Sequence, residues 1–431
     1  MASTESDSLD SFTMNSPLVS FTTFGMFILD EIHWLSHGPT SPPPKYNLVG
    51  GAGTYAALGA RLVLSDAPAF AKDAKEVSWI VDVGSDFPLQ VRKTIDSWNT
   101  DCIFREDTAR LTTRAWNGYG DQEHRDFRYL TPKKRLEVSS LNIRQIKSRS
   151  FHMVCSPERC HELASSLKRA RTEQGVDETP VVVWEPIPDL CTPAELTNLQ
   201  QAAKHCTVIS PNSAELKMFF PDEHGATQQH LVHQLLRLDK HNHSQGSIPH
   251  AIIREGADGC TIYVVLPPDE LGVIATQPIH LPAYHTTACD PTAIDSATRV
   301  SDPTGGGNTF LGALSLALTL SPLMASTPTP AGNDMPSRPL TALIQQHLKL
   351  NPGLQAAASG HIIQLVTATI YALIAASYAI EQNGVPSLAR SENGDTELWN
   401  GTSLMARTER YLHREASMIT KQIERCIAGS G

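Results

Sequence analysis

A run of three glycines lies between polar residues in the segment DPTGGGN, Asp302–Asn308. It leads directly into TFLGALSLAL, whose apolar and small residues predict a helix. A helix that begins at glycines exposes backbone N–H groups at the positive end of its dipole, which favours a bound anion. The glycines alone fit equally well a turn that only joins a strand to a helix. The flanking Asp302, Thr304 and Asn308 favour the anion site.

A second group of glycines lies in NLVGGAGTYAALGARL, before a predicted helix that begins near Thr54. Gly50 and Gly51 predict a tight strand-to-helix turn at which the backbone closely approaches another group. Upstream, the apolar run FTTFGMFILDEI predicts one strand that ends at Asp30 and Glu31. A carboxylate at a strand end often binds a ligand, but an ordinary turn residue is the alternative for Asp30.

Two shorter patterns add polar candidates. SPNSAEL places Asn212 and Glu215 in N-x-x-E spacing, and REGADGC carries Gly256 and Gly259 after a predicted strand. Each pattern alone is common by chance. Arg254, at the start of the second pattern, fits a surface charge as well as a phosphate contact, so the predicted site does not include it.

The elements that position these residues are predicted from alternating composition. Apolar runs such as VSWIVDVG, FHMVC, PVVVWEPI and HAIIREG predict strands, and several are separated by segments of helical composition. The predicted helices are Glu158–Arg171, Pro193–Lys204 and Gln228–Leu238. Strands that alternate with helices predict an α/β fold with a parallel sheet covered on both faces.

One stretch departs from this alternation. Residues 101–130 alternate apolar or aromatic side chains with charged ones, which predicts a small antiparallel sheet inserted as a flap or lid. Arg114, Trp116, Arg125 and Arg128 are candidates for closing over a ligand, because lids exclude water and complete a site. A solvated, charged sheet face is the alternative.

The predicted organisation is a single domain over residues 21–431. Residues 1–20 are predicted to be a disordered tail, and the Pro-, Ser- and Thr-rich residues 321–340 a flexible insertion. Ile362–Ile380 is free of formal charge and long enough to span a membrane. Its Gln, Thr, Ser and Tyr residues favour a buried core helix instead.

Composition narrows the class of protein. The formal net charge of −10 argues against a nucleic-acid partner, because binding to a phosphate backbone needs clustered Lys and Arg. The eight cysteines lack paired metal or redox spacing, so we expect reduced thiols and a cytoplasmic location. No membrane partner is expected.

Taken in chain order, these segments resemble the signatures of the ribokinase-like PfkB family of carbohydrate kinases. DPTGGGN resembles the second signature, usually DTxGAGD, and GGAGTYAALGARL resembles the first. ALIAASYAIEQNGVPSL is similar to the family's closing helix, so the resemblance covers most of Phe21–Leu388. The chain is most similar to the fungal killer-maintenance-type branch, which also has a DPTGGGN-type turn. The resemblance implies a three-layer fold with a central, mainly parallel sheet and a small antiparallel lid sheet.

The resemblance also implies ATP and Mg²⁺ as cofactors and a role for each candidate residue. The anion hole for the transferred phosphate would be formed by Gly305, Gly306 and Gly307. The substrate-binding positions correspond to Asp30, Gly50, Gly51 and Tyr55. The nucleotide-binding positions correspond to Asn212, Glu215, Gly256, Gly259, Asp302 and Thr304, with Mg²⁺ held near Glu215. By analogy alone, lid sheets would pair two copies into a homodimer.

Two positions depart from the family pattern. The family places its catalytic base, an Asp, where this chain has Asn308. An amide binds a hydroxyl but cannot take its proton, and loss of general-base catalysis costs a factor of about 10² to 10⁴ in rate. Tyr55 replaces a frequent Asn, which leaves the substrate class open. Two hypotheses follow: a slow ATP-dependent kinase for a sugar or sugar-like alcohol, or a catalytically silent relative that binds nucleotide or metabolite and acts as a regulator or assembly partner.

Overall fold

The computed structural model describes residues 18–35, 42–66, 74–120, 125–237, 248–265, 277–286, 299–320, 339–348 and 357–428. Its centre is a nine-stranded sheet in the order β13-β12-β11-β10-β9-β8-β1-β4-β5. All pairs from β11 to β5 are parallel, and only β11–β12 and β12–β13 are antiparallel. The strands are β1 Phe21–Thr23, β4 Val77–Val83, β5 Asp101–Glu106, β8 Ser150–Cys155, β9 Val181–Pro186, β10 Val208–Ile209, β11 His250–Arg254, β12 Cys260–Tyr263 and β13 Ile279–Leu281.

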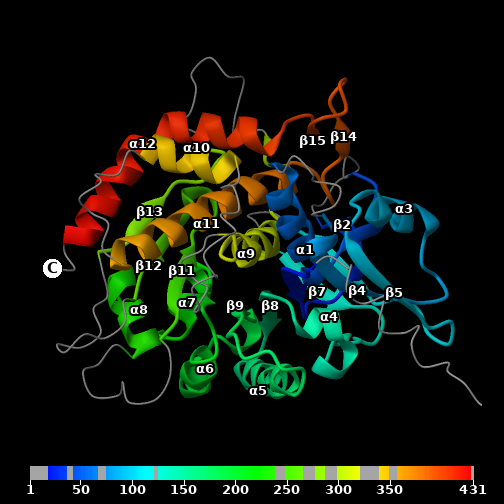
Figure 1. Cartoon of the computed structure of the whole chain (residues 1–431). Helices are drawn as coiled ribbons and strands as arrows, with labels where there is room; N and C mark the ends of the chain where they lie inside the picture. The colour runs from blue at the N-terminus through cyan, green and yellow to red at the C-terminus, as the bar shows by residue number, and fades with distance from the viewer. Residues whose placement is uncertain are drawn as a thin grey trace, which may run out of the picture.

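Helices cover both faces of this sheet (Figure 1). One face packs against α1 Ala52–Val63, α3 Leu89–Ser97, α9 Gly306–Ala317, α10 Pro339–Leu348, α11 Ala357–Ala379 and α12 Leu404–Ala428. The other face packs against α5 Pro157–Glu173, α6 Leu196–Ala203, α7 Ser213–Met218 and α8 Gln228–Leu236, and the short α4 Ile143–Ile146 contacts α5. Alternate residues of a strand serve the two faces: Val183 belongs to the first core and Trp184 to the second. The predicted three-layer α/β fold is therefore confirmed.

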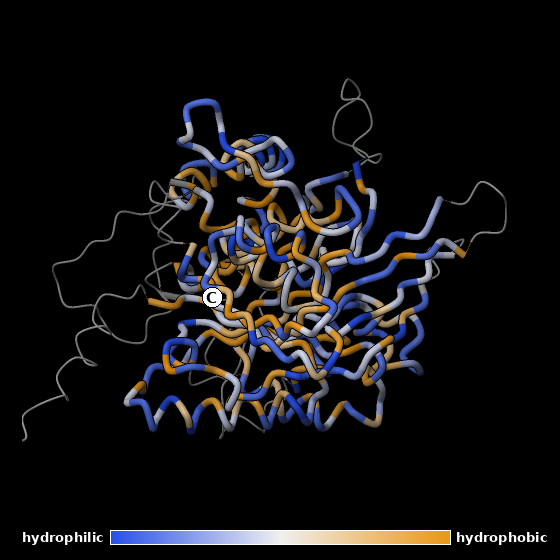
Figure 2. The backbone as a smooth tube through the Cα atoms, turned by 90° about the vertical axis from the view of Figure 1, so that its right-hand side faces the viewer, coloured by the Kyte–Doolittle hydropathy of each residue, from blue (hydrophilic) through white to orange (hydrophobic). Residues whose placement is uncertain are grey.

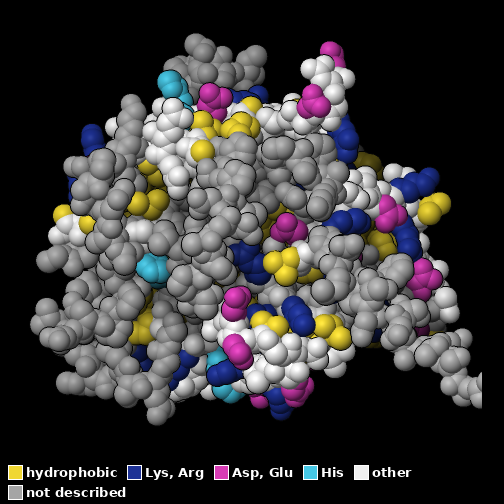
Figure 3. All heavy atoms as spheres, in the orientation of Figure 1, with side chains coloured by type: hydrophobic (Ala, Val, Ile, Leu, Met, Phe, Trp, Pro, Cys, Tyr) yellow, Lys and Arg dark blue, Asp and Glu magenta, His cyan; other side chains and the backbone are white. Residues whose placement is uncertain are grey.

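Hydropathy follows the same layers. In Figure 2 the apolar segments gather in the interior strands and helices, and polar segments lie toward the outside. On the face seen in Figure 3, charged side chains of both signs are scattered over the described surface. Strand β4 is buried along its whole length, as expected for a strand covered on both faces.

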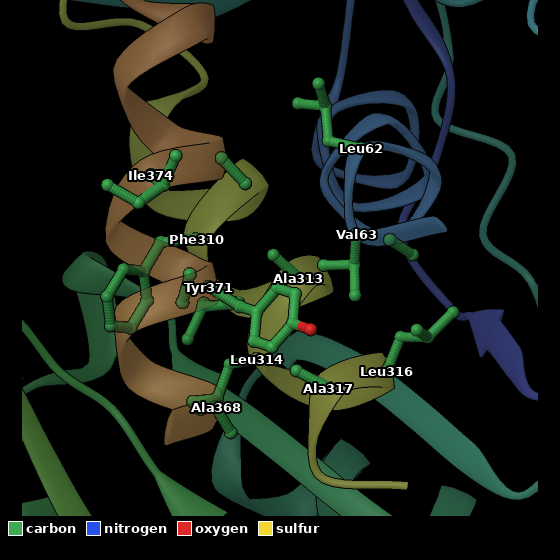
Figure 4. Close-up of a cluster of buried hydrophobic side chains, with 14 of the residues drawn as sticks. Leu62, Val63, Phe310, Ala313, Leu314, Leu316, Ala317, Ala368, Tyr371 and Ile374 are labelled. Atoms are coloured by element: carbon green, nitrogen blue, oxygen red, sulfur yellow. The ribbon is translucent and has the colours of Figure 1, made fainter. Parts of the chain in front are cut away.

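Helix α11 contains the predicted membrane-length segment. Gly360–Ala379 is long and apolar enough to cross a membrane, but 89% of its most apolar window is buried inside the protein. Figure 4 shows Ala368, Tyr371 and Ile374 of α11 among side chains from α9 and α1. The structure therefore places this segment as a core helix, as the sequence predicts.

The helices α1 and α9 approach each other closely because each has a glycine at the contact. A methyl group on Gly59 would overlap the backbone oxygen of Thr309, and one on Gly312 would overlap the backbone of Ala56. This contact fixes the position of the DPTGGGN turn, since that turn begins α9.

A second, four-stranded sheet forms the lid, in the order β3-β2-β6-β7. Its strands are β3 Lys45–Gly50, β2 Ile28–Trp34, β6 Arg114–Tyr119 and β7 Arg125–Tyr129. The outer pairs are antiparallel and the central β2–β6 pair is parallel. The predicted insertion at 101–130 therefore supplies only β6 and β7, because residues 101–106 form β5 at the edge of the main sheet.

The prediction of a single strand across FTTFGMFILDEI is wrong. The run divides into β1 of the main sheet and β2 of the lid. Residues 24–27 between the two strands belong to neither sheet, and a side chain on Gly25 would overlap the backbone of Gly53, at the start of α1. Asp30 is thus the third residue of β2 and not the end of the first strand.

Two remaining predictions fall mostly outside the described residues. These are the disordered tail at 1–20 and the flexible insertion at 321–340. Of the tail, Leu18 is described and exposed, and Val19 and Ser20 are described and buried. Near the C-terminus, a hairpin of β14 Leu388–Arg390 and β15 Glu397–Trp399 is tied to α1 by a buried ion pair between Glu397 and Arg61.

Candidate active site

The DPTGGGN turn begins α9, as the sequence predicts. Gly305 is the N-cap residue and has a left-handed backbone (φ 83°), which glycine adopts without strain. A methyl group on Gly305 would overlap the ring of Tyr55, and one on Gly307 would overlap Nη1 of Arg254. The start of α9 therefore has an aromatic ring at Gly305 and a guanidinium at Gly307, and a cation beside a helix N-terminus suits an anion.

Arg254 is the main residue that the sequence analysis missed. It ends β11, and its Nη2 forms ion pairs with Glu185 Oε1 and, at 3.5 Å, with Glu215 Oε2. Its Nε donates to the backbone oxygen of Ser210 at 3.2 Å. Arg254 and Glu185 each lie at the carboxyl end of a parallel strand, the edge at which α/β sheets bind ligands. Their position after the apolar runs HAII and VVVW was the available signal.

Asn212 and Glu215 are brought together at the start of α7. Asn212 Oδ1 accepts from the Glu215 N–H and Glu215 Oε2 accepts from the Asn212 N–H, both at 2.8 Å, so they form a capping box. Burial, and then the nearby Glu185 carboxylate, raises the pKa of Glu215 to about 7 against the opposing effect of Arg254. The N-x-x-E pattern thus has a structural role as well as a place beside Arg254.

Asp302 is buried and joins the lid to the glycine turn. Its Oδ1 accepts from the Thr304 N–H at 2.9 Å and from the Tyr119 hydroxyl at 3.2 Å. Its Oδ2 accepts from the Asn383 amide at 3.1 Å. Tyr119 also makes a short hydrogen bond with the Thr304 hydroxyl. Because Tyr119 ends β6, this end of the lid sheet rests on the glycine turn.

Asp30 and Gly50 lie together on β2 and β3, two neighbouring strands of the lid. A methyl group on Gly50 would overlap the Asp30 carboxylate, so glycine is needed for this approach. Asp30 is paired with Ala115, which is paired with Tyr129, so the three side chains share one face of the lid. Burial, and then the Asp30 charge, raises the pKa of Tyr129. Gly51, with φ 90°, is the N-cap residue of α1.

The two departures from the family pattern both lie at the glycine turn. Tyr55 is 3% exposed and its ring lies against Gly305. Asn308 is the third residue of α9, and within the described part of the chain its buried Oδ1 accepts no hydrogen bond. Asn308 therefore offers an acceptor oxygen where the family has a carboxylate.

Gly256 and Gly259 form the turn between β11 and β12, both with positive φ (61° and 100°). A side chain on Gly259 would overlap the backbone at Leu281, at the end of β13, so this glycine is required for packing. A Cβ on Gly256 would meet no described atom within 4 Å. Only Gly256 therefore leaves room beside the turn.

The lid candidates do not converge on this site. Arg114 ties the lid to the loop after β4, donating to Asp86 at 2.6 Å and to Asn47 at 3.0 Å. The Arg128 guanidinium stacks on Trp116 at 4.7 Å, and both residues follow the alternation onto the lid face opposite Asp30. Arg125 is the first residue of β7.

Among the described residues, no group of three or more His, Cys, Asp or Glu side chains is arranged to hold a metal ion. Glu215, the predicted Mg²⁺ ligand, instead faces Arg254 with Glu185. Carboxylate oxygens are nevertheless the donors that Mg²⁺ prefers, and within the described residues the buried Glu185 Oε2 has no hydrogen-bond partner. The donor set therefore fits Mg²⁺ once Arg254 has another partner.

Comparison with known proteins decides the family. The model of the pfkB family carbohydrate kinases matches residues 47–323. The chain belongs to this family. It is 35% identical over 322 residues to the protein MAK32 of Saccharomyces cerevisiae, over 70% of this chain and 80% of that protein. It is 29% identical over 425 residues to an uncharacterized protein of Schizosaccharomyces pombe, over 95% of this chain and 98% of that one.

Solved structures show the same fold. The ribokinase of Giardia lamblia superposes with a TM-score of 0.54 at 14% identity, over 85% of this chain and 95% of that one. A putative ribokinase II of E. coli in complex with ATP and Mg²⁺ superposes with a TM-score of 0.51 at 16% identity, over 92% and 100% of the two chains. This pfkB family member is therefore ribokinase-like in fold, and it belongs with the fungal MAK32-like branch.

Proposed function

We propose that this protein transfers a phosphoryl group from ATP to a hydroxyl group of a sugar or sugar-like small molecule, in the cytoplasm. One observation carries the proposal: α9 begins at three consecutive glycines, and the last of them, Gly307, lies against the guanidinium of Arg254. Backbone N–H groups and a fixed cation are what stabilise a phosphoryl group during transfer.

The residues divide into an acceptor side and a phosphate side. Asp30, on the lid beside Gly50 and Gly51, accepts hydrogen bonds from acceptor hydroxyls, and Tyr55 bounds the acceptor next to the turn. The N–H groups of the α9 turn, with Arg254, hold the transferred group. The nucleotide would be held by Asn212, Glu215, Gly256, Gly259, Asp302 and Thr304. ATP would supply the phosphoryl group, and Mg²⁺ near Glu215 would offset its charge.

Asn308, at the position of the family's catalytic base, limits the rate of the proposed phosphoryl transfer. Its Oδ1 orients the attacking hydroxyl but does not take the proton, so the reaction relies on positioning and on charge stabilisation. We therefore expect transfer that is slower by about 10² to 10⁴ than with a carboxylate at this position.

A catalytically silent, ligand-binding protein is the second candidate function. One observation favours it: both carboxylate oxygens of Asp302 already accept hydrogen bonds, from Tyr119 and Asn383. An Asp302 carboxylate that is already held by side chains of the lid and the core favours a regulator or assembly partner over an enzyme.

The discriminating experiment compares the parent with Asn308→Asp, using ATP, MgCl₂ and a panel of sugars and nucleosides. We expect slow turnover by the parent and a gain of about 10² to 10⁴ in the variant. Asn308→Ala, which lacks the acceptor oxygen, is the matched control and should be slower than the parent. Turnover by Asn308→Asp alone, with ATP binding by both proteins, would establish the silent function. Absence of any ATP-dependent thermal shift in the parent would contradict both functions.

A further inference from the structure

The guanidinium of Arg254 lies between two sites of opposite charge. Its Nη1 faces Gly307, in the turn that suits an anion. Its Nη2 faces Glu185 and Glu215, the two carboxylates at the neighbouring strand end and helix start. The Arg254 side chain therefore contacts both the expected phosphate site and the expected site of a divalent cation.

The charges of Glu185, Glu215 and Arg254 would allow a divalent cation to replace the guanidinium beside the two carboxylates. The side chains of Glu185, Glu215 and Arg254 are 10%, 4% and 14% exposed, so water screens them weakly. Two carboxylates share one cation, and among the described residues Glu185 Oε2 accepts no hydrogen bond. A divalent cation would neutralise the pair fully, whereas one guanidinium does so only in part.

We propose that Arg254 is an internal cation that occupies the carboxylate pair of Glu185 and Glu215, and that a bound phosphate draws it away and opens this pair to a divalent metal ion. The inference rests on the proposed function only in taking the α9 turn as the phosphate site. Metal and phosphate then bind cooperatively, because each is favoured by the position of Arg254 that the other requires. Metal alone competes with a tethered cation and binds weakly.

The first experiment measures the thermal stability of the parent and of Arg254→Gln with MgCl₂ or MnCl₂ at constant ionic strength, without nucleotide. We expect no rise in Tm of the parent, and a rise of at least about 2 °C in the variant at about 10 mM metal. Adding Glu215→Gln to the variant should remove the response. An equal rise in parent and variant, or none in either, would overturn the proposal.

Arg407→Gln is the matched control. Arg407 is also buried and also pairs with a glutamate, Glu381, at 2.8 Å, but it has a single carboxylate partner. This variant should lose stability, as Arg254→Gln does, without any response to metal. A metal response of equal size in Arg407→Gln would show that any unpaired buried carboxylate responds, which contradicts a specific site.

The second experiment needs no variant and so stands even if Arg254→Gln does not fold. The Tm of the parent is measured with inorganic phosphate, with MgCl₂, and with both. We expect the joint shift to exceed the sum of the separate shifts, and simple additivity would refute the coupling. Neither experiment contains ATP or an acceptor. A catalytically silent protein can therefore pass them, and an active kinase can fail them.

Discussion

At the scale of residues, the ionisation of two carboxyl groups, Glu215 in the site and Glu381 outside it, depends on the groups around them. Glu381, just after α11, is a second example: it accepts from Arg407 and Asn400 at 2.8 Å and lies 3.2 Å from His285. Burial opposes its ionisation, yet the hydrogen bonds from His285 and Arg407 outweigh burial and lower the pKa of Glu381 to about 2. The network lies next to Ile380, whose backbone oxygen accepts from the Asp302 N–H.

This pKa predicts how stability depends on pH. A carboxyl group whose pKa is lowered by folding stabilises the native state above its ordinary pKa, and loses that contribution as the pH falls toward the folded value. The parent should therefore lose stability between about pH 4.5 and pH 2 through this group. Glu381→Gln should cost about 2 kcal/mol at pH 7, allowing for partial screening, and flatten the loss.

Urea unfolding from pH 7 to pH 3 checks the effect of Glu381→Gln. Glu392→Gln, on the exposed turn of the β14–β15 hairpin, is the control and should follow the parent. If Glu381→Gln lost as much stability on acidification as the parent, the carboxylate would not carry the effect.

At the scale of elements, the end of β6 acts as a contact between lid and core. Tyr119→Phe removes one hydroxyl that bonds Asp302 and Thr304. We expect a loss of about 1 kcal/mol and faster hydrogen exchange at the backbone amides of β6. Tyr46→Phe, on the exposed part of β3, is the control and should leave exchange unchanged. Unchanged protection of β6 in Tyr119→Phe would show that the hydroxyl does not hold the lid.

The close contact between α1 and α9 leads to a second prediction at this scale, about stability. Gly312→Ala places a methyl group against the backbone of Ala56, so the helices must separate. We expect a loss of about 1 to 3 kcal/mol by urea unfolding. Gly307→Ala in the same helix meets only the end of the Arg254 side chain and no backbone, so it should cost less stability while weakening phosphate binding. Equal stability of Gly312→Ala and the parent would contradict a tight contact.

At the scale of the whole molecule, the sequence predicts what depends on local pattern. The apolar runs at β4, β8, β9 and β11 and the glycines before α9 are read directly from the chain. The division of residues 21–34 between two sheets is not, because it depends on the close approach of Gly25 to Gly53. The pairing of Arg254 with Glu185 is also not predictable from the sequence. The two residues are adjacent only because β9, β10 and β11 align their carboxyl ends.

The separation of the two sheets has a further consequence. Asp30 belongs to the lid, whereas the glycine turn and Arg254 belong to the core, and the hydrogen bonds of Tyr119 join the two near the turn. The proposed function therefore predicts that substitutions on the inner lid face change which small molecule is accepted and leave phosphate binding unchanged. Under the proposed function, Asp30 would contribute to selectivity from the lid, whereas the groups proposed to hold phosphate all lie in the core.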